Sequence, residues 1–330
     1  MADKLGILLV NLGTPDATSY WPMRKYLKEF LSDPRVIEAK GPIWWLIFNG
    51  IILTRLPKKS GQAYAKIWNT ELDESPLKSI TRAQCELVAE NFAKNSDIQV
   101  DWAMRYGSPA IAGKIDKLTA GGCDRILIFP LYPQYSAATT ASVMDKVFDK
   151  LKTMRRQPTI RSVPPYYDHP SYIEALACSI KEHHASLEWT PDVTIASLHG
   201  LPQTFINNGD PYQVQCEKTV ELLRRVTGLN ENQLILTYQS RSGRAEWTGP
   251  DTEDTLRSLA TKGVKNLSVI TPGFASDCVE TLEEINIRAS ETFLQAGGLN
   301  FSLIHCLNES SHSIKMLCDL IETNILGWQP

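Results

Sequence analysis

The sequence lacks the short motifs that identify the commonest nucleotide-binding and hydrolytic enzymes. It has no G-x-x-x-x-G-K-[ST] phosphate loop, no G-x-S-x-G nucleophile elbow and no H-E-x-x-H zinc motif, and NLGTPD stands at 11–16 where a dinucleotide-binding chain would carry G-x-G-x-x-G. Its seven cysteines include no C-x-x-C pair, which argues against a zinc knuckle. Because seven is odd and no signal-peptide pattern opens the chain, we expect free thiols and a cytoplasmic location.

A surplus of positive charge is also absent. The 330 residues include 34 Lys or Arg and 37 Asp or Glu, which leaves a net charge of −3. A general nucleic-acid-binding protein needs many unpaired cations to neutralise phosphates, so we expect no nucleic-acid partner. The apolar fraction of 43% and the charged fraction of 22% are typical of globular proteins. The length predicts about two domains.

No apolar run is long enough to cross a membrane as a helix. The most apolar stretch, IWWLIFNGIIL at 43–53, has 11 residues and is bracketed by Pro42 and Pro57. A membrane-spanning helix needs roughly 20 residues. Two interpretations stay open for this stretch: a buried core helix, or an exposed apolar lip against a membrane surface or over an apolar ligand.

Short apolar runs alternate with longer amphipathic patterns along the whole chain, and this alternation predicts parallel sheets with helices on both faces. The expected strands lie at 6–12, 99–104, 125–130, 159–163, 193–197, 233–238, 266–270 and 301–305. They divide into two groups of four around Pro164 and Pro165. We therefore predict an α/β fold of two similar doubly wound, Rossmann-like domains, 1–164 and 165–309, with a C-terminal helix within 310–330 that packs back on the first.

Most of these strands lead directly into a polar or aromatic cluster. The clusters lie at 11–15, 105–107, 132–136, 197–202, 239–241 and 272–274. Ligands of open parallel sheets bind beyond the carboxyl ends of the strands. We therefore expect the clusters to converge on one cleft between the two domains.

Two of the polar positions could carry chemistry on a cation. His199 follows a strand and precedes Gly200, so a tight turn would present its imidazole as a proton acceptor or metal ligand. Asp277, Glu280 and Glu284 have spacings that place them on one helix face. Asp277 with Glu280 also fits a helix capping box, so a capping role and a cation-binding role both stay open. One imidazole and one carboxylate make an incomplete metal site, which would suit a metal that is passed on.

Aromatic and basic residues near the strand ends would suit a large planar ligand with carboxylate edges. The candidates that we expect to contact such a ligand are Arg105, Tyr135 and Trp247, and further arginines at 55, 241 and 244 add positive charge. For each arginine the simpler alternative is a solvated surface charge, which is the better interpretation for Arg244.

Several longer motifs together resemble the ferrochelatase family, whose members insert ferrous iron into a porphyrin. They are LLVNLGTP at 8–15, FLSDPRVIE at 30–38, YPQYS at 132–136, SLHGLP at 197–202, GDPY at 209–212, TYQSRSG at 237–243 and SDCVETLEEI at 276–285. The resemblance implies a chelatase-like fold and insertion of ferrous iron into protoporphyrin IX, with release of two protons, to form protohaem in the last step of haem biosynthesis. The alternatives are a coproporphyrin ferrochelatase, a chelatase for another metal or tetrapyrrole, and a non-catalytic haem or porphyrin carrier.

The resemblance also implies roles for individual residues. His199 takes the place of the family's essential histidine, and Glu280 that of its metal-binding glutamate, so both are expected to contact iron. The porphyrin-contacting positions fall on Arg55, Tyr64 and Ser75.

Some members of the family hold an iron–sulfur cluster through a cysteine that follows the YPQYS motif. Ala137 stands at that position here, so we expect no cluster and no retained cofactor, with Fe²⁺ and the porphyrin as substrates. For Cys278, packing is a better interpretation than metal ligation. We expect a monomer or weak dimer, with residues 43–53 as the candidate for a peripheral contact with the inner membrane.

Overall fold

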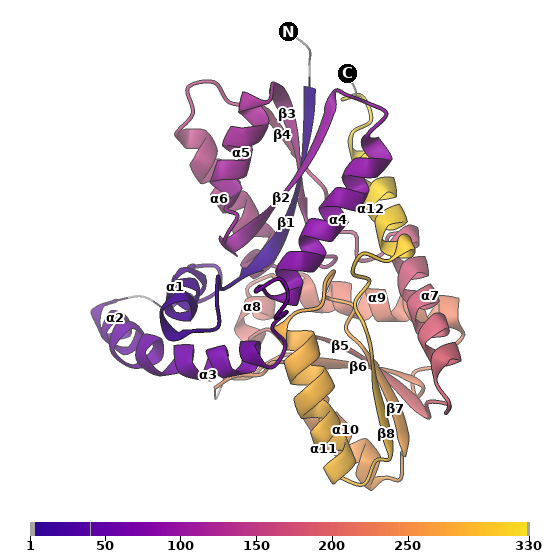
Figure 1. Cartoon of the computed structure of the whole chain (residues 1–330). Helices are drawn as coiled ribbons and strands as arrows, with labels where there is room; N and C mark the ends of the chain where they lie inside the picture. Colours follow the sequence, from indigo (N-terminus) through magenta and orange to yellow (C-terminus); the bar gives the residue numbers. More distant parts are fainter. Residues whose placement is uncertain (1–3, 40, 244, 329–330) are drawn as a thin grey trace. The chain divides into compact units, whose positions relative to one another are not determined.

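The computed structural model describes residues 4–39, 41–243 and 245–328, which form two compact units (Figure 1). The N-terminal unit comprises residues 1–131, 137–164 and 317–330, and the C-terminal unit comprises 132–136 and 165–316. Relative to the division expected from the sequence, the YPQYS segment at 132–136 belongs to the C-terminal unit. The end of the chain returns to the N-terminal unit.

The sheet of the N-terminal unit is entirely parallel, with the strand order β2-β1-β3-β4. The strands are β1 (Lys4–Thr14), β2 (Ile98–Gly107), β3 (Cys123–Pro130) and β4 (Thr159–Ser162). Leu5, Ile7 and Leu9 on β1 are fully buried, and so are Leu8 and Val10, whose side chains lie on the opposite face. Burial on both faces is typical of a parallel sheet covered by helices, and it explains the continuous apolar run at the start of the sequence.

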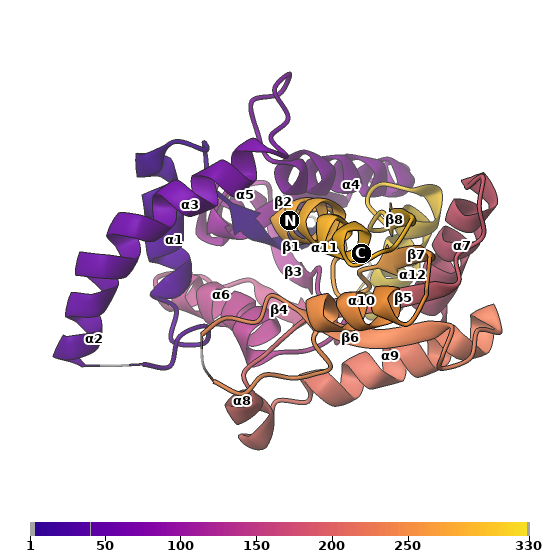
Figure 2. The same cartoon turned by 90° about the horizontal axis from the view of Figure 1, so that it is seen from below.

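Amphipathic patterns at 79–95 and 138–153 predict two helical segments of the N-terminal unit, and a helix is one of two interpretations left open for 43–53. The predicted ones are α4 (Pro76–Phe92) and the pair η2 (Ala137–Ala141) and α6 (Ser142–Lys152). The others are α1 (Tyr20–Leu31), α2 (Pro42–Ile47), η1 (Phe48–Ile52), α3 (Leu53–Ala65) and α5 (Ile111–Ala120). Figure 2 shows α2 and α3 as one continuous rod that runs beside α1.

The apolar stretch at 43–53 forms the first part of this rod, and most of its large side chains face solvent. Phe48 is buried, but the exposed fractions of Ile43, Trp45 and Leu46 are 74%, 62% and 63%. The structure therefore favours the exposed lip over the buried core helix. Within the described part of the chain, no helix combines the length and the apolar character needed to cross a membrane.

The C-terminal unit repeats the same architecture with the strand order β6-β5-β7-β8, again entirely parallel. Its strands are β5 (Val193–His199), β6 (Leu234–Gln239), β7 (Asn266–Ile270) and β8 (Asn300–Ile304). A core of buried aliphatic and aromatic residues, centred on Ile195, Val269 and Phe293, packs between this sheet and its helices. All eight predicted strands are present, and the predicted fold class is confirmed.

Seven helical segments belong wholly or partly to the C-terminal unit. They are α7 (Pro170–Ser186), α8 (Gln203–Asn207), α9 (Tyr212–Thr227), α10 (Thr252–Thr261), η3 (Glu280–Ala289), α11 (Ser290–Gln295) and the first part of α12 (Ser311–Asn324). The sequence predicts that the helix formed by η3 and α11 begins at Asp277. That start is wrong, because the helix begins at Glu280 and its first ten residues are π-helical.

Two arginines fix the end of the chain on the N-terminal sheet. Arg161 on β4 donates through Nη1 to the carbonyl oxygens of Asn324 and Leu326, and Arg125 on β3 donates to that of Trp328. The guanidinium of Arg161 also lies over the Trp328 ring, 4.2 Å from its centroid. The last carbonyls of a helix have no partner within the helix, so these arginines satisfy groups that would otherwise need water.

Gly13 is required by the close approach of β1 and β2 at their carboxyl ends. Its φ is +115°, and a Cβ at this position would lie 1.9 Å from the carbonyl oxygen of Tyr106. We expect Gly13→Ala to destabilise the protein by at least about 2 kcal/mol, because strain in φ adds to a clash with backbone. Thermal unfolding measures this change.

The matched control for this prediction is Gly113→Ala in α5, where a Cβ would meet nothing within 4 Å. That variant should be more stable than the parent by about 0.5–1 kcal/mol, because glycine disfavours a helix interior. Equal stability of the two variants would contradict the argument.

Candidate functional site

His199 is the last residue of β5, and its surroundings fix the imidazole ring. Nδ1 lies 2.6 Å from the carbonyl oxygen of Gly200, which can only accept, so Nδ1 carries the proton of the neutral ring. The backbone N–H of Gly200 donates to the carbonyl of Gln239 at 2.8 Å, which continues the strand pairing through the turn. The half-buried ring therefore has Nε2 as its unprotonated nitrogen, able to accept a proton or bind a metal.

Gln239 connects this strand end to the start of η3. It is the partner of His199 in the parallel register of β5 and β6. Its Oε1 accepts a hydrogen bond from Ser197 at 2.8 Å, and its Nε2 donates to the carbonyl oxygen of Glu280 at 2.8 Å. The first residue of η3 is therefore tied through one buried side chain to the strand that carries His199.

Glu284 is held by the residue that follows Gln239. Its two carboxylate oxygens accept hydrogen bonds from the backbone N–H and the hydroxyl of Ser240, both at 2.7 Å. Ser240 has a φ of +66°, a conformation that is uncommon for residues other than glycine. Strained backbone that aims two donors at one carboxylate marks a functional position. Arg288, one turn further along η3, lies 3.7 Å from the same carboxylate.

The pKa of Glu284 is raised above its usual value, and burial is the main cause. The hydrogen bond from Ser240 and the charges of His199 and Arg288 oppose the increase, while the charge of Glu280 adds to it. His199, Glu280 and Glu284 therefore lie within one electrostatic neighbourhood. The structure brings together in the C-terminal unit three of the four residues that the sequence singled out for cation chemistry.

Asp277 does not belong to the exposed acidic row that the sequence predicted. Only 3% of its surface is exposed, and its carboxylate is surrounded by donors, namely the side chains of Thr281, His305 and Asn308 and the backbone N–H of Cys306. The residue at the capping position of η3 is Val279, two residues after Asp277. The capping-box interpretation is wrong because tertiary partners occupy the carboxylate.

Trp247 packs beside the His199 turn. A Cβ on Gly200 would lie 3.4 Å from Cε3 of the indole, so the ring covers the turn closely. The backbone of Trp247 also forms an isolated antiparallel bridge with Pro202. Its indole Nε1 is buried and makes no hydrogen bond with the described residues.

The YPQYS segment is anchored to the start of α9 and the residues before it. The backbone N–H of Tyr135 donates to the side chain of Gln215 at 2.7 Å, and Ser136 donates to Asp210 at 3.0 Å. The phenol of Tyr135 as a ligand contact stays a prediction. Arg241 is exposed and pairs with Asp251 and Asp254, as expected of a surface charge, and Arg244 lies outside the described residues.

In the N-terminal unit, three of the expected porphyrin contacts follow one another along the chain. Arg55 and Tyr64 lie on α3, Arg55 exposed and Tyr64 buried against Tyr26 and Trp68. Ser75 precedes α4, and its buried hydroxyl makes no hydrogen bond with the described residues. Their convergence with His199 on one cleft stays a prediction.

Arg105 is buried, and Nε and Nη2 of its guanidinium have partners, while the buried Nη1 makes no hydrogen bond with the described residues. Nε donates to the carbonyl and hydroxyl oxygens of Ser142 at 2.9 and 2.6 Å, and Nη2 pairs with Asp33. The guanidinium also stacks on Tyr106, with 4.2 Å between its central carbon and the ring centroid. These contacts favour a structural role, and a contact of Arg105 with substrate stays a prediction.

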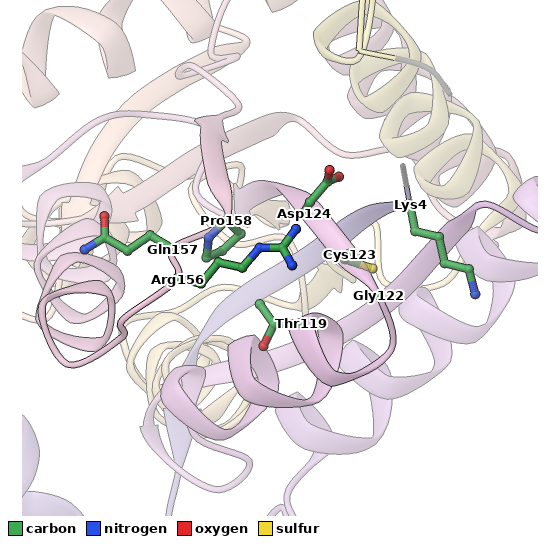
Figure 3. A pocket seen from close by; sticks show the side chains of 8 residues that line it. All are labelled: Lys4, Thr119, Gly122, Cys123, Asp124, Arg156, Gln157 and Pro158. Atoms are coloured by element: carbon green, nitrogen blue, oxygen red, sulfur yellow. The ribbon is translucent and has the colours of Figure 1, made fainter. Parts of the chain in front are cut away.

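A separate cavity of about 290 Å³ lies at the opposite end of the N-terminal sheet (Figure 3). Its lining includes Lys4 at the start of β1, Cys123 at the start of β3 and Pro158 before β4. Ligands of parallel sheets bind at the carboxyl ends of strands, so this cavity at the amino ends is not the candidate site.

The described residues contain no group of three or more His, Cys, Asp or Glu side chains with a geometry that could hold a metal ion. The parts of the site that sequence reasoning missed are Gln239, Ser240 and His305. The polar cluster at 239–241 pointed to the first two residues. Nothing in the sequence indicates that the backbone of Ser240 adopts a left-handed conformation.

Comparison with known proteins identifies the family. The ferrochelatase family model matches residues 4–325. Curated ferrochelatases from Chelativorans sp. and Mesorhizobium japonicum are 54% and 53% identical, each over 99% of this chain and 93% of the relative. Among solved structures, the structure of SirB from Bacillus subtilis with Fe³⁺ superposes with a TM-score of 0.59. The match covers 99% of this chain and 98% of SirB. Because the sequences are only 10% identical, it shows a shared fold alone. The chain belongs to the ferrochelatase family.

Proposed function

We propose that His199 and Glu280 carry out the reaction of this ferrochelatase, in which ferrous iron enters protoporphyrin IX, two protons leave the pyrrole nitrogens and protohaem forms. This reaction is the last step of haem synthesis. The observation that carries the assignment is the fixed tautomer of His199, whose Nε2 is unprotonated within the electrostatic neighbourhood of Glu280 and Glu284. A base and a carboxylate row are the two chemical elements that metal insertion with proton release requires.

His199 would accept protons from the pyrrole nitrogens. The carbonyl of Gly200 holds the proton on Nδ1, so Nε2 is the basic nitrogen before the reaction. The charge of His199 lowers the pKa of Glu284, so the two groups interact electrostatically. Glu284 has a raised pKa and can take the proton on, because its two forms are closer in free energy at neutral pH than those of an ordinary glutamate.

Glu280 would deliver the iron. A carboxylate and an imidazole bind Fe²⁺ only moderately, since Fe²⁺ lies low in the order of affinities of divalent metals. Transfer to four pyrrole nitrogens would then be favourable. Glu284, directed by Ser240, would supply a second negative charge along the same helix face.

Porphyrin contacts are proposed separately for residues of each unit. Trp247 offers a flat apolar wall beside His199. Tyr135 lies in the YPQYS segment that follows β3. Arg55 and the unpartnered hydroxyl of Ser75 suit the propionate carboxylates, with Tyr64 as the aromatic residue between them in sequence. Arg105 would act by keeping the carboxyl end of β2 in place.

We further infer that the enzyme works without a resident cofactor, as a monomer or weak dimer in the cytoplasm. Alanine at position 137 supports the absence of an iron–sulfur cluster. The exposed lip at 43–53 supports a peripheral contact with the inner membrane, because its apolar side chains would leave water on docking.

Replacing His199 by alanine should lower kcat for iron insertion by at least about 100-fold, because a positioned base is lost. Porphyrin affinity should change little. Anaerobic assays that follow the loss of porphyrin fluorescence measure both. His312→Ala is the matched control, since this histidine of the same unit is paired at the surface with Glu182. Near-full activity of the His199 variant would overturn the assignment, and stoichiometric binding without turnover by the parent protein would favour a carrier.

Loss of the Ser240 hydroxyl should shift the pH profile of the reaction. This hydrogen bond lowers the pKa of Glu284, so Ser240→Gly and Ser240→Ala should raise that pKa and move the acidic limb of kcat to higher pH. We expect kcat at neutral pH to fall by about three- to tenfold. The glycine variant controls for misfolding, because glycine adopts the left-handed conformation without strain. An unchanged profile in both variants would contradict the role of Glu284.

Membrane contact through the lip predicts that Trp45→Ser combined with Leu46→Ser will weaken binding to lipid vesicles at least tenfold, since each large apolar side chain contributes about 2 kcal/mol on burial. Flotation with vesicles measures this. The control combines Val214→Ser with Val226→Ser on α9, two valines that are also exposed. Equal binding of both double variants would exclude the lip as the contact.

A further inference from the structure

The segment that precedes η3 is fastened to the segment that follows β8. His305 donates through Nδ1 to Oδ2 of Asp277 at 2.7 Å, and Asn308 donates to the same oxygen at 2.8 Å. In return, the backbone N–H of Asp277 donates to Oδ1 of Asn308 at 2.8 Å. Asn308 has a φ of +47°, which turns the chain so that its side chain can make both contacts. We call these three residues the Asp277 anchor.

A second set of contacts connects the anchor to the first turn of η3. Thr281 donates through its hydroxyl to Oδ1 of Asp277 at 2.9 Å and accepts from the backbone N–H of Cys278 at 3.0 Å. Thr281 is the chain neighbour of Glu280, so these bonds reach the first turn of η3. Between His305 and Thr281 lies a continuous series of hydrogen bonds through the Asp277 carboxylate.

We propose that His305 is a positioning residue for iron delivery, which holds Asp277 and thereby sets the place of Glu280 at the start of η3. The inference rests on the proposed function of Glu280. The anchor holds Thr281, and Gln239 binds the Glu280 carbonyl. The start of η3 is therefore held by two separate sets of hydrogen bonds.

Charge strengthens the interaction between His305 and Asp277. The side chain is 63% exposed, and the charged or titratable groups that act on it are Asp277 before η3 and His183 on α7. Asp277 raises the pKa of His305, so the ion pair is complete at acidic pH and is lost as pH rises through that raised value. Neutral His305 still donates a hydrogen bond to Asp277, so the interaction between the two side chains weakens at high pH but is not lost.

The test compares His305→Ala with His305→Asn, because the asparagine amide can place a donor close to the position of Nδ1. In His305→Ala we expect KM for Fe²⁺ to rise and kcat to fall, each roughly three- to tenfold, with KM for protoporphyrin unchanged. His305→Asn should recover most of the loss at high pH and less at low pH, where the parent protein has the ion pair. A merely structural role would affect both substrates alike and would give no pH-dependent rescue.

Thiol reactivity gives a readout that does not depend on activity. All seven cysteines are free; Cys278 and Cys306 are buried beside the anchor, and Cys178 is only half-buried. An aromatic disulfide reagent should react with one thiol in the parent protein and with further thiols, at least about tenfold faster than in the parent, in His305→Ala. His312→Ala again serves as the control.

The outcomes separate this inference from the proposed function. If His305→Ala leaves the KM for Fe²⁺ and the thiol reactivity unchanged while Glu280→Gln abolishes insertion, the positioning role is overturned and the function of Glu280 stands. If Glu280→Gln retains full activity, the proposed function of Glu280 fails, and a change in thiol reactivity alone would then show only a structural anchor.

Discussion

The parallel register between β5 and β6 is the constraint on which the rest of the site depends. It places His199 opposite Gln239, so an imidazole and a buried amide lie side by side at the strand ends. The amide of Gln239 then extends the sheet's hydrogen bonding to the carbonyl of Glu280, and Ser240 extends it to the carboxylate of Glu284. A slip of one residue would turn each of these side chains to the other face of the sheet. The relative position of base and acidic row is thus a property of the sheet.

Burying the carboxylate of Glu284 costs solvation free energy, and hydrogen bonds from Ser240 offset part of this cost. Loss of solvent around Glu284 raises its pKa. The backbone N–H and the hydroxyl of Ser240 replace part of the lost hydration with hydrogen bonds. The donors are available only because Ser240 adopts a left-handed backbone. Strain at one residue therefore fixes the orientation of a carboxylate that also feels the charge of His199. The same carboxylate is thus held in place by hydrogen bonds while burial raises its pKa.

The sequence was sufficient for the architecture because hydrophobic periodicity is local. All eight strands were predicted, since strands buried on both faces are continuous apolar runs. The roles of Asp277 and Arg105 depend instead on tertiary partners. Asp277 has the spacing of a cap, yet His305, 28 residues further on, occupies its carboxylate. Arg105 follows a strand as a ligand contact would, yet Ser142, 37 residues away, receives its hydrogen bonds. Periodicity carries no information about such pairs.

The commitment of Asp277 to tertiary partners determines which acidic residues remain beside His199. A cap at Asp277 would start a helix there, but the carboxylate is bound to Thr281, His305 and Asn308. The helix η3 begins three residues later, with Glu280 bound through its carbonyl by Gln239. Asp277 is therefore a structural carboxylate, and Glu280 and Glu284 are the acidic residues that share an electrostatic neighbourhood with His199.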